Sequence, residues 1–484
     1  MAFTIVKQVI KMKVLLVYPH TPTFYGLPNY PPLGLSYLAG TLKHENIDYD
    51  VIDLRVYEDW KSVFLAELQK KYDLVGMGCS AYDYNPVRDL AQLIKIELPQ
   101  SKIFLGGPYP TLVKDKILRE DRNFDFLIAG EGELTLKELL EALQGKRSLG
   151  SVNGLIFRNG SEIKVNPPRE YNEDLDSLPF PDYSKYDLKK YHGDTSLKGI
   201  LKRTRIFPMT TSRGCPYSCT FCSIPVFVGK KFRIRSPESV IKEIKYLKKE
   251  YRAGIIDILD DNMTLYLDRA KEICKLMIKE KLNISWGTPN GVRADKVDEE
   301  LAELMHKSGC NGVAVGIESV DNAVLKNIKK AETIETITKG IQVLKKHKVP
   351  VKGFFLIGSP GGSKEEILKA LEYSKENNLD EARFSMATPY PGTELYDWVS
   401  ANNAWKVENP EEDVVKFTHG GDVKALYGTD SFSAEDMEAV YKEASAGWEE
   451  YDLQRNFQKR FKKKLQEYPK LRLALKAVRD KVKA

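Results

Sequence analysis

Long hydrophobic runs are missing from this chain of 484 residues. No apolar stretch approaches the roughly 18 residues that a membrane span needs, and the sequence does not open with an apolar segment and cleavage site of the secretory type. Cysteine is scarce too, because six residues are far too few for a disulfide scaffold. With 42% hydrophobic and 29% charged residues, the composition predicts an ordinary globular protein of the reducing cytoplasm.

A strong excess of one charge is also missing, since the net charge is +6. The charge is uneven, however: residues 455–484 hold twelve Lys and Arg against two acids, and the rest of the chain sums to −4. This tail carries spaced Phe and Leu residues, and such a basic amphipathic segment can lie peripherally on an anionic inner membrane surface. It can equally be a solvated helix or cover core surface. The acidic body and the absence of a recognisable RNA-binding motif argue against nucleic acid.

Residues 1–150 alternate short apolar runs with helical patterns such as Leu90–Leu98. The runs do not alternate with polar residues, which is typical of parallel strands buried on both faces. We therefore predict an α/β domain, a Rossmann-like doubly wound parallel sheet, with ligands at the carboxyl ends of its strands. The expected strands are Val14–Tyr18, Val51–Asp53, Leu74–Gly78, Ile103–Gly106 and Phe126–Ala129.

Residues 151–200 have the pattern of a hairpin and a linker. The runs Leu155–Arg158 and Glu162–Val165 flank Asn159-Gly160, a pair that strongly favours a tight hairpin turn. The Pro-containing acidic segment Asp174–Asp182 then reads as a linker.

Residues 201–398 repeat the β/α pattern six times, which predicts a partial TIM-like (β/α)6 barrel with its site at the carboxyl ends of the strands. Residues 399–484 are expected to form a helical C-terminal region with the basic tail, including a helix over Ala434–Leu453. The barrel strands are expected at Phe207–Thr211, Ile255–Leu259, Ile284–Gly287, Gly312–Ile317, Gly353–Ile357 and Ala382–Met386, with helices at Ser239–Tyr251, Asp268–Glu280 and Glu299–Lys307.

Half of the cysteines lie in one octapeptide directly after the first barrel strand: Cys215, Cys219 and Cys222. Three thiolates in one loop can converge on a metal centre. A structural zinc would want a fourth ligand, usually from a second close cysteine pair, and none follows. Three thiolates suit a cubane iron–sulfur cluster with one open iron, and the C-x3-C-x2-C spacing differs from that of electron-carrier ferredoxins. Three unrelated buried cysteines are the remaining alternative.

The C-x3-C-x2-C motif, with Phe221 before its last cysteine, resembles that of the radical S-adenosylmethionine (SAM) superfamily over about residues 205–395. The resemblance implies a [4Fe–4S] cluster on the three cysteines, with SAM bound at the open iron next to Phe221. It also implies reductive cleavage of SAM to a 5′-deoxyadenosyl radical, with electrons from a flavodoxin or ferredoxin. The cofactors would carry the chemistry, and the barrel would orient them and exclude water.

Five further residues are candidates for SAM contacts. Asp260 and Asp261 end the second barrel strand, where relatives bind the SAM amino group; the alternative is a helix N-cap. Glu318 follows a Gly312–Gly316 strand that resembles the family's, one residue short. Arg293 can pair with the SAM carboxylate or belong to a surface salt bridge. Ser359 follows the fifth strand, near the expected adenine.

The first block resembles the cobalamin-binding domain that precedes many radical SAM domains, through its Pro31–Leu35, Gly106–Pro108 and Gly130–Glu133 segments. Glycines after strands let backbone approach a flat ring or a nucleotide tail. The cobalt-ligating D-x-H-x-x-G motif is absent, so either cobalt has no histidine ligand or the domain no longer binds cobalamin. His20 lacks that spacing and is a loop or capping residue, or a ligand. The contacts implied for cobalamin come from Ser80, Gly106, Gly107, Pro108, Glu131 and Gly132.

The combined resemblance implies a cobalamin-dependent radical SAM methyltransferase acting on an unactivated carbon of a small molecule or lipid. A radical cyclisation, rearrangement or carbon–carbon coupling without methyl transfer is the second hypothesis. A cobalamin- or redox-sensing binding protein is the third, and the intact three-cysteine loop argues against it. The remaining cysteines, Cys79, Cys274 and Cys310, are expected to be buried structural residues.

Overall fold

The computed structural model of the protein describes residues 12–21, 28–191, 204–408, 410, 423–429 and 431–456. It divides into two compact units, Met1–Tyr191 with Val226–Val228, and His192–Pro225 with Gly229–Ala484. The basic tail after residue 456 lies outside the described residues, so its expected amphipathic helix is not described. None of the helices in these ranges combines the length and apolar character needed to cross a bilayer.

The first unit is built on a seven-stranded sheet with the order β2-β1-β3-β4-β5-β6-β7. Its first five strands are parallel, in the order of a doubly wound flavodoxin-like sheet, which confirms the predicted fold class. The predicted hairpin forms, and its first strand pairs antiparallel with β5, so the hairpin extends this sheet. The strands are β1 (Lys13–Tyr18), β2 (Asp48–Asp53), β3 (Leu74–Gly78), β4 (Lys102–Gly106), β5 (Phe126–Ile128), β6 (Leu155–Asn159) and β7 (Glu162–Val165).

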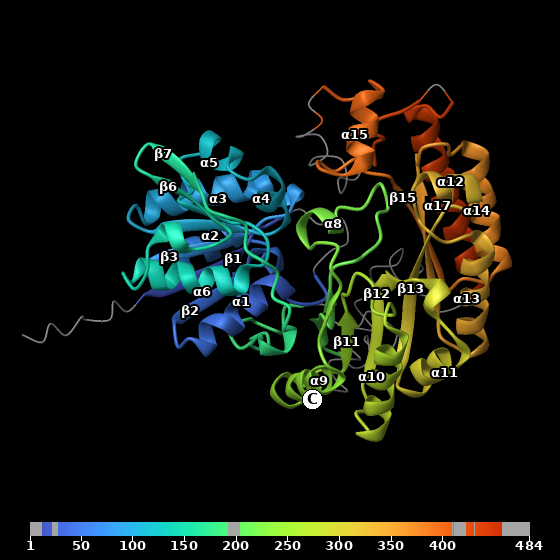
Figure 1. Cartoon of the computed structure of the whole chain (residues 1–484), viewed down its shortest axis with the longest axis horizontal. Coiled ribbons are helices and arrows are strands. Elements are labelled where there is room, and N and C mark those ends of the chain that lie inside the picture. Colours follow the sequence, from blue (N-terminus) through green and yellow to red (C-terminus); the bar gives the residue numbers. More distant parts are fainter. Residues whose placement is uncertain are drawn as a thin grey trace, which may run out of the picture. The chain divides into compact units, whose positions relative to one another are not determined.

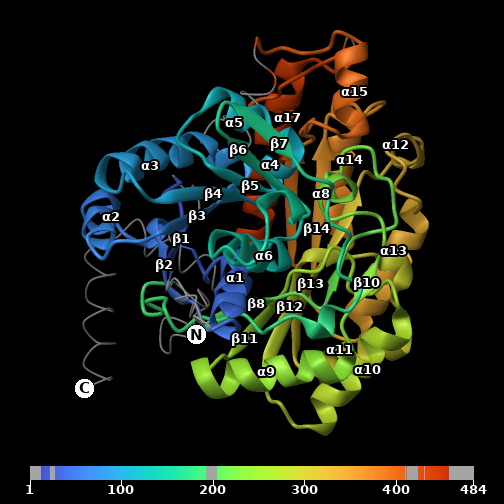
Figure 2. The same ribbon diagram turned by 60° about the vertical axis from the view of Figure 1, so that its left-hand side comes forward.

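Helices cover both faces of this sheet. Figure 2 shows α1 and α3 on opposite sides of the strands. Alternate strand residues face each side; Leu15 and Val17, for example, share a core with Phe64 of α2 and Leu90 of α3. This two-sided burial explains the uninterrupted apolar runs in the sequence. The helices are α1 (Leu33–His44), α2 (Trp60–Leu68), α3 (Tyr84–Glu97), α4 (Pro108–Val113), α5 (Lys116–Glu120) and α6 (Gly132–Leu143).

The second unit contains a six-stranded parallel sheet in sequential order, β15-β14-β13-β12-β11-β8. Sequential parallel strands joined by helices are the topology of a partial barrel, as predicted. The strands begin up to two residues before the expected ones or one residue after them, and the third continues five residues further. They are β8 (Ile206–Met209), β11 (Ile255–Ile258), β12 (Ser285–Val292), β13 (Cys310–Glu318), β14 (Val351–Ile357) and β15 (Glu381–Met386); β9 (Ser212–Arg213) and β10 (Arg233–Ile234) form a separate antiparallel pair.

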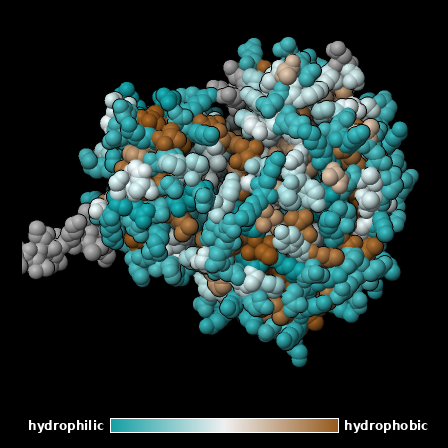
Figure 3. Space-filling view, viewed as in Figure 1, coloured by the Kyte–Doolittle hydropathy of each residue, from teal (hydrophilic) through white to brown (hydrophobic). Residues whose placement is uncertain are grey.

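Most of the long helices of the second unit run outside the row of strands (Figure 1). Their outward faces are mostly hydrophilic in Figure 3, since their apolar faces are buried against the sheet. Side-chain caps fix several helix starts; Ser236 caps α9 and Asp298 caps α11. The helices are α9 (Pro237–Tyr251), α10 (Leu267–Lys279), α11 (Glu299–Lys307), α12 (Asn322–Asn327), α13 (Ile334–Lys346), α14 (Lys364–Glu376), α15 (Glu394–Ala401) and α17 (Ala434–Arg455); the short helix α8 (Ile224–Phe227) has residues in both units.

Candidate active site

The cysteine loop leaves the barrel after β8 and the short strand β9. Gly214 turns the chain with φ +86°, a left-handed conformation that suits glycine, and a Cβ there would lie 3.0 Å from the Gly229 carbonyl oxygen. The Cys215 N–H donates to that same carbonyl at 3.3 Å, so this hydrogen bond joins the start of the cysteine loop to Gly229 at its end. Phe221 is half-buried within the loop. The predicted ligands therefore share one constrained turn at the carboxyl end of a barrel strand.

The three thiols act on one another electrostatically. Burial raises the pKa of Cys222 to about 12, and Cys219 and Cys215 add to the shift. Burial also raises the pKa of Cys219 and of Cys215. Ionising these buried thiols costs free energy unless a cation lies next to them. The iron ions of a cluster supply that positive charge. Among the described residues no three acidic, His or Cys side chains converge as ligands of a single ion. A cubane does not need such convergence, because it offers each cysteine a separate iron, so the three thiols fit a [4Fe–4S] cluster.

Asp260 and Asp261 anchor the start of the cysteine loop. Asp260 is buried and accepts from the Thr211 N–H at 2.5 Å, the Thr211 hydroxyl at 2.5 Å and the Ser212 hydroxyl at 2.6 Å. Asp261 accepts from the Gly214 N–H at 3.2 Å. The alternative of a helix N-cap is wrong, because the N-cap of α10 is Tyr266. The expected SAM contact through Asp260 is also not favoured, since both of its oxygens already hold the chain that leads into the loop.

Several buried polar atoms in the described part of the second unit lack a hydrogen-bond partner within the usual distance. Among them are the amide of Asn262, which also acts on the Cys215 thiol, and the hydroxyl of Ser359. Buried polar groups are normally hydrogen-bonded, so orphaned ones point to a ligand. An amide both accepts and donates, which matches the ammonium and carboxylate of an amino acid such as the methionyl part of SAM. Sequence reasoning predicted Ser359 but passed over Asn262 for its acidic neighbours.

Arg293 braces the cysteine loop from the end of β12. Its guanidinium lies 3.8 Å from the centre of the Tyr217 ring. In the sequence, Tyr217 lies between Cys215 and Cys219. It pairs with Asp295 at 3.0 Å and donates to the backbone oxygens of Lys330 and Ala331 at 2.8 and 2.7 Å. The side chain is 8% exposed, so a surface salt bridge is wrong. Most of its N–H donors are thus occupied within the protein, which favours a role in holding the loop, and the contact with the SAM carboxylate stays a prediction.

Glu318 lies at the end of β13, where the strand pairing shifts by one residue in a bulge. Its carboxylate accepts from the Lys330 ammonium at 3.1 Å, and both side chains are 10% exposed. Lys330 was not predicted, since it lies twelve residues away on a loop and nothing in the sequence pairs it with Glu318.

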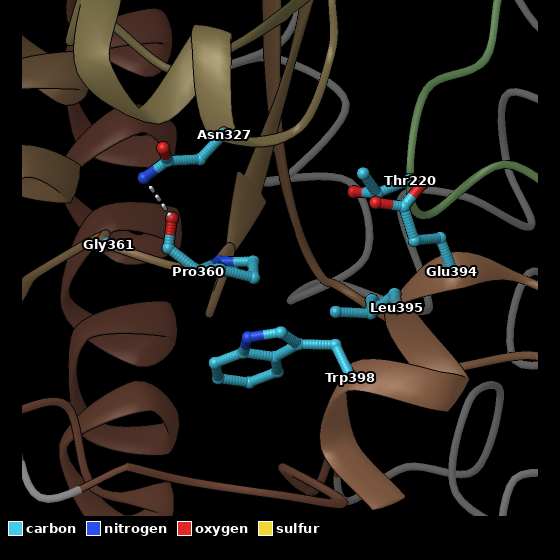
Figure 4. Close-up of a pocket in the computed structure, with 7 residues that line it drawn as sticks. All are labelled: Thr220, Asn327, Pro360, Gly361, Glu394, Leu395 and Trp398. Atoms are coloured by element: carbon cyan, nitrogen blue, oxygen red, sulfur yellow. Dashed lines mark hydrogen bonds between the residues drawn. The ribbon is translucent and has the colours of Figure 1, made fainter. Parts of the chain in front are cut away.

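A cavity of about 340 Å³ abuts the cysteine loop on the side of α12 and α15. Figure 4 shows Trp398 beneath Pro360, and Asn327 donating to the Pro360 oxygen at 3.1 Å. Thr220 lines the cavity from within the loop, and its carbonyl accepts from the Leu395 N–H at 2.9 Å. The loop is thereby fixed to the elements after the last barrel strands.

The residues predicted to bind cobalamin lie at the carboxyl ends of β3, β4 and β5. Ser80 is held by Asp83, which accepts from its N–H and its hydroxyl at 3.0 and 2.7 Å. Gly106 ends β4, and a Cβ there would meet nothing closer than 3.8 Å. Gly107 has φ +110° before Pro108 starts α4. Glu131 and Gly132 lie at the start of α6. At Gly106 this glycine-lined edge lets a ligand approach the backbone, as a flat ring requires.

The other candidates have structural positions. The Nδ1 of His20 lies 3.2 Å from the Leu54 carbonyl oxygen, and its ring stacks on Trp60 with centroids 5.5 Å apart. This fixed position favours the loop role over that of a cobalt ligand. The three remaining cysteines are buried as predicted, namely Cys79, Cys274 and Cys310.

Comparison with known proteins agrees with this arrangement. A family model for the radical SAM superfamily matches residues 209–396, and one for the B12 binding domain matches residues 27–140. An uncharacterized methyltransferase of Pyrococcus horikoshii is 34% identical over 84% of this chain and 88% of its own length. Cytidylyl-2-hydroxyethylphosphonate methyltransferase of Streptomyces wedmorensis is 31% identical over 79% of this chain and 80% of its own. The solved structure of the radical SAM methyltransferase TsrM from Kitasatospora setae shares the fold, with TM-score 0.68, 19% identity, and coverage of 81% of this chain and 76% of that one.

Proposed function

Because the chain belongs to the radical SAM superfamily and carries a B12-binding domain ahead of its radical SAM domain, we propose that it methylates an unactivated carbon of a small molecule. The observation that carries this proposal is the presence of both sites in one chain: the constrained three-cysteine loop and the glycine-lined sheet edge. When bound, the cluster with SAM supplies a 5′-deoxyadenosyl radical, and cobalamin supplies the methyl group.

The protein's own residues bind and orient these groups. In this proposal Cys215, Cys219 and Cys222 hold the cluster, while Asn262 and Ser359 receive polar groups of SAM. Asp260 and Arg293 hold the loop in place. Residues 1–150 form the cobalamin domain, 151–200 the hairpin and linker, 201–398 the radical SAM core and 399–484 the C-terminal region. The cofactors are a [4Fe–4S] cluster, SAM and cobalamin, with a flavodoxin or ferredoxin as electron donor.

A lipid is the alternative substrate class. Hopanoid C-3 methylase of Methylococcus capsulatus is 28% identical over 80% of this chain and 72% of its own length, and the basic segment 455–484 suits a cytoplasmic protein bound peripherally to anionic lipid. Flotation with anionic liposomes tests this, comparing the full chain with one lacking residues 455–484. Tail-dependent flotation supports a lipid substrate; equal flotation or none removes the membrane proposal.

A second candidate is a radical reaction without methyl transfer. The observation that favours it is a relative of 29% identity over 80% of this chain and 69% of its own, anaerobic magnesium-protoporphyrin IX monomethyl ester cyclase of Rubrivivax gelatinosus. This relative is named for a cyclisation and not for a methyl transfer. Product accounting separates the two candidates, because methyl transfer alone yields S-adenosylhomocysteine.

The test is anaerobic reconstitution with iron, sulfide and cobalamin, followed by SAM and a strong reductant. We expect 5′-deoxyadenosine together with cobalamin-dependent S-adenosylhomocysteine. Cys219→Ala should abolish both products, while Cys274→Ala, a buried cysteine on α10, should keep them. Formation of 5′-deoxyadenosine alone supports the non-methylating candidate, and 5′-deoxyadenosine from Cys219→Ala would refute the cluster assignment.

A further inference from the structure

Glu318 and Lys330 form a buried ion pair whose geometry depends on an intervening glycine. The pair spans 3.1 Å, and Glu332 lies 3.8 Å from the same ammonium. A Cβ on Gly316 would overlap Glu318 Oε1 and lie 2.9 Å from Lys330 Nζ. Any larger residue at Gly316 would thus displace the pair. A buried pair of this kind is weak evidence for stability, because desolvation offsets much of the Coulomb attraction. Stability alone therefore does not account for this buried pair.

The backbone on both sides of the pair is held in a conformation that L-residues rarely adopt. Glu318 has φ +64°, and Lys329 and Ala331, which flank the lysine, have φ +54° and +55°. Each such residue carries backbone strain. Residues 328–333 form the loop between α12 and α13, called the lysine loop below. Arg293 holds this loop in its conformation through hydrogen bonds to the Lys330 and Ala331 carbonyls. Strain persists only where the surroundings over-determine it, and here it fixes the position of one buried ammonium group.

The lysine loop is joined to the cysteine loop at two points. Arg293 holds the lysine loop and stacks on Tyr217 of the cysteine loop. The Thr220 N–H donates to the Ile328 carbonyl at 3.0 Å. Thr220 follows Cys219 directly and Ile328 precedes Lys330 by two residues, so this contact holds the lysine next to the cysteine loop. The buried ammonium and its paired carboxylate therefore place opposite charges beside that loop.

We propose that Lys330 and Glu318 are positioning residues that set the reduction potential of the cluster held by Cys215, Cys219 and Cys222. The inference rests on the proposed function, since it requires the cluster. Reduction adds one electron to the cluster, and a fixed positive charge nearby stabilises the reduced state, whereas a fixed negative charge destabilises it. Lys330 thus raises the potential and Glu318 lowers it. Both are shielded from water, so their effect is not screened as that of a surface charge is.

The test is an anaerobic redox titration of the reconstituted cluster, followed by electron paramagnetic resonance in the absence of SAM. Lys330→Met should shift the reduction equilibrium about tenfold towards the oxidised cluster, which is about 59 mV downwards for one electron. Glu318→Gln should shift it upwards by a similar factor, and the double variant should return close to the wild-type value. The matched control is Lys329→Met: the same charge is lost one residue away, where the side chain is 53% exposed and pairs with Glu394 at 2.7 Å. It should change the equilibrium less than about twofold.

A general loss of structure would not shift the reduction potential in opposite directions in Lys330→Met and Glu318→Gln. The inference is overturned if both single variants shift the potential in the same direction, or if Lys330→Met shifts it no more than Lys329→Met at equal iron content. If Lys330→Met takes up no cluster, Glu318→Gln decides alone, and the absence of an upward shift overturns the inference. A wild-type chain that takes up no cluster would instead refute the proposed function, which iron and sulfide analysis shows directly.

Discussion

Replacing Asp260 separates a residue that binds SAM from one that holds the fold. The carboxylate accepts three hydrogen bonds in a buried site, from the Thr211 N–H, the Thr211 hydroxyl and the Ser212 hydroxyl. In Asp260→Ala these donors lose their acceptor without access to water, at about 1–3 kcal/mol each. The hydroxyls can turn towards other acceptors, so we expect a net loss of about 3–5 kcal/mol in the free energy of unfolding.

Asp260→Asn is the conservative variant. Its amide oxygen can still accept from the Thr211 N–H, while the lost charge weakens the two hydroxyl contacts, so the expected loss is about 1–3 kcal/mol. For a unit of this size the alanine variant should melt on the order of 10 °C lower, and the asparagine variant a few degrees lower. Asp268→Asn is the control, because it removes the same charge from an exposed position on α10, where changes stay within about 0.5 kcal/mol.

The assay pairs anaerobic thermal unfolding of the cluster-free protein with equilibrium dialysis of SAM against the reconstituted protein. We expect both Asp260 variants to lose melting temperature in the cluster-free state, where no SAM contact can contribute. The reasoning is refuted if Asp260→Asn melts like the wild type and yet loses SAM binding. That result would identify Asp260 as a direct SAM contact, despite its three hydrogen bonds within the protein.

Three further predictions concern other parts of the chain. Gly107→Ala should cost about 1–3 kcal/mol in unfolding experiments, because its φ of +110° excludes a side chain and the new Cβ would lie 2.8 Å from the Cys79 oxygen. Gly106→Val should fold normally, since the site has room, but should bind cobalamin at least tenfold more weakly by absorbance titration; undiminished binding would show that cobalamin does not approach this edge. Burial raises the pKa of Asp257 to about 6, with Lys352 opposing, so its neutral form is favoured on folding. The stability it contributes is present at about pH 4 and lost by about pH 6, and Asp257→Asn should remove about 1–3 kcal/mol of that decline in denaturant titrations; an unchanged pH profile would contradict this.

Much of the fold could be predicted because its signals are local. Strands such as Leu74–Gly78 are continuous apolar runs, and that strand matches the prediction at both ends. The Asn159-Gly160 pair correctly predicted the hairpin. It did not predict that the first strand of the hairpin, β6, pairs with β5. Strand pairing across separate elements depends on the tertiary structure, and local sequence does not encode it.

The site divides in the same way. The three cysteines, their spacing and their place after a barrel strand are local features, so the sequence alone determines a cluster loop and, with the glycine-rich first domain, the class of chemistry. What Asp260 and Arg293 do was decided by the fold, because both point back into the protein and use their hydrogen-bonding capacity to hold the loop. Glu318 and Lys330 meet only because a bulge and a left-handed turn bring two separate segments across Gly316. A motif fixes which atoms bind; only the packing of distant segments fixes which charges surround them, because electrostatic interactions depend on distance in space and on burial.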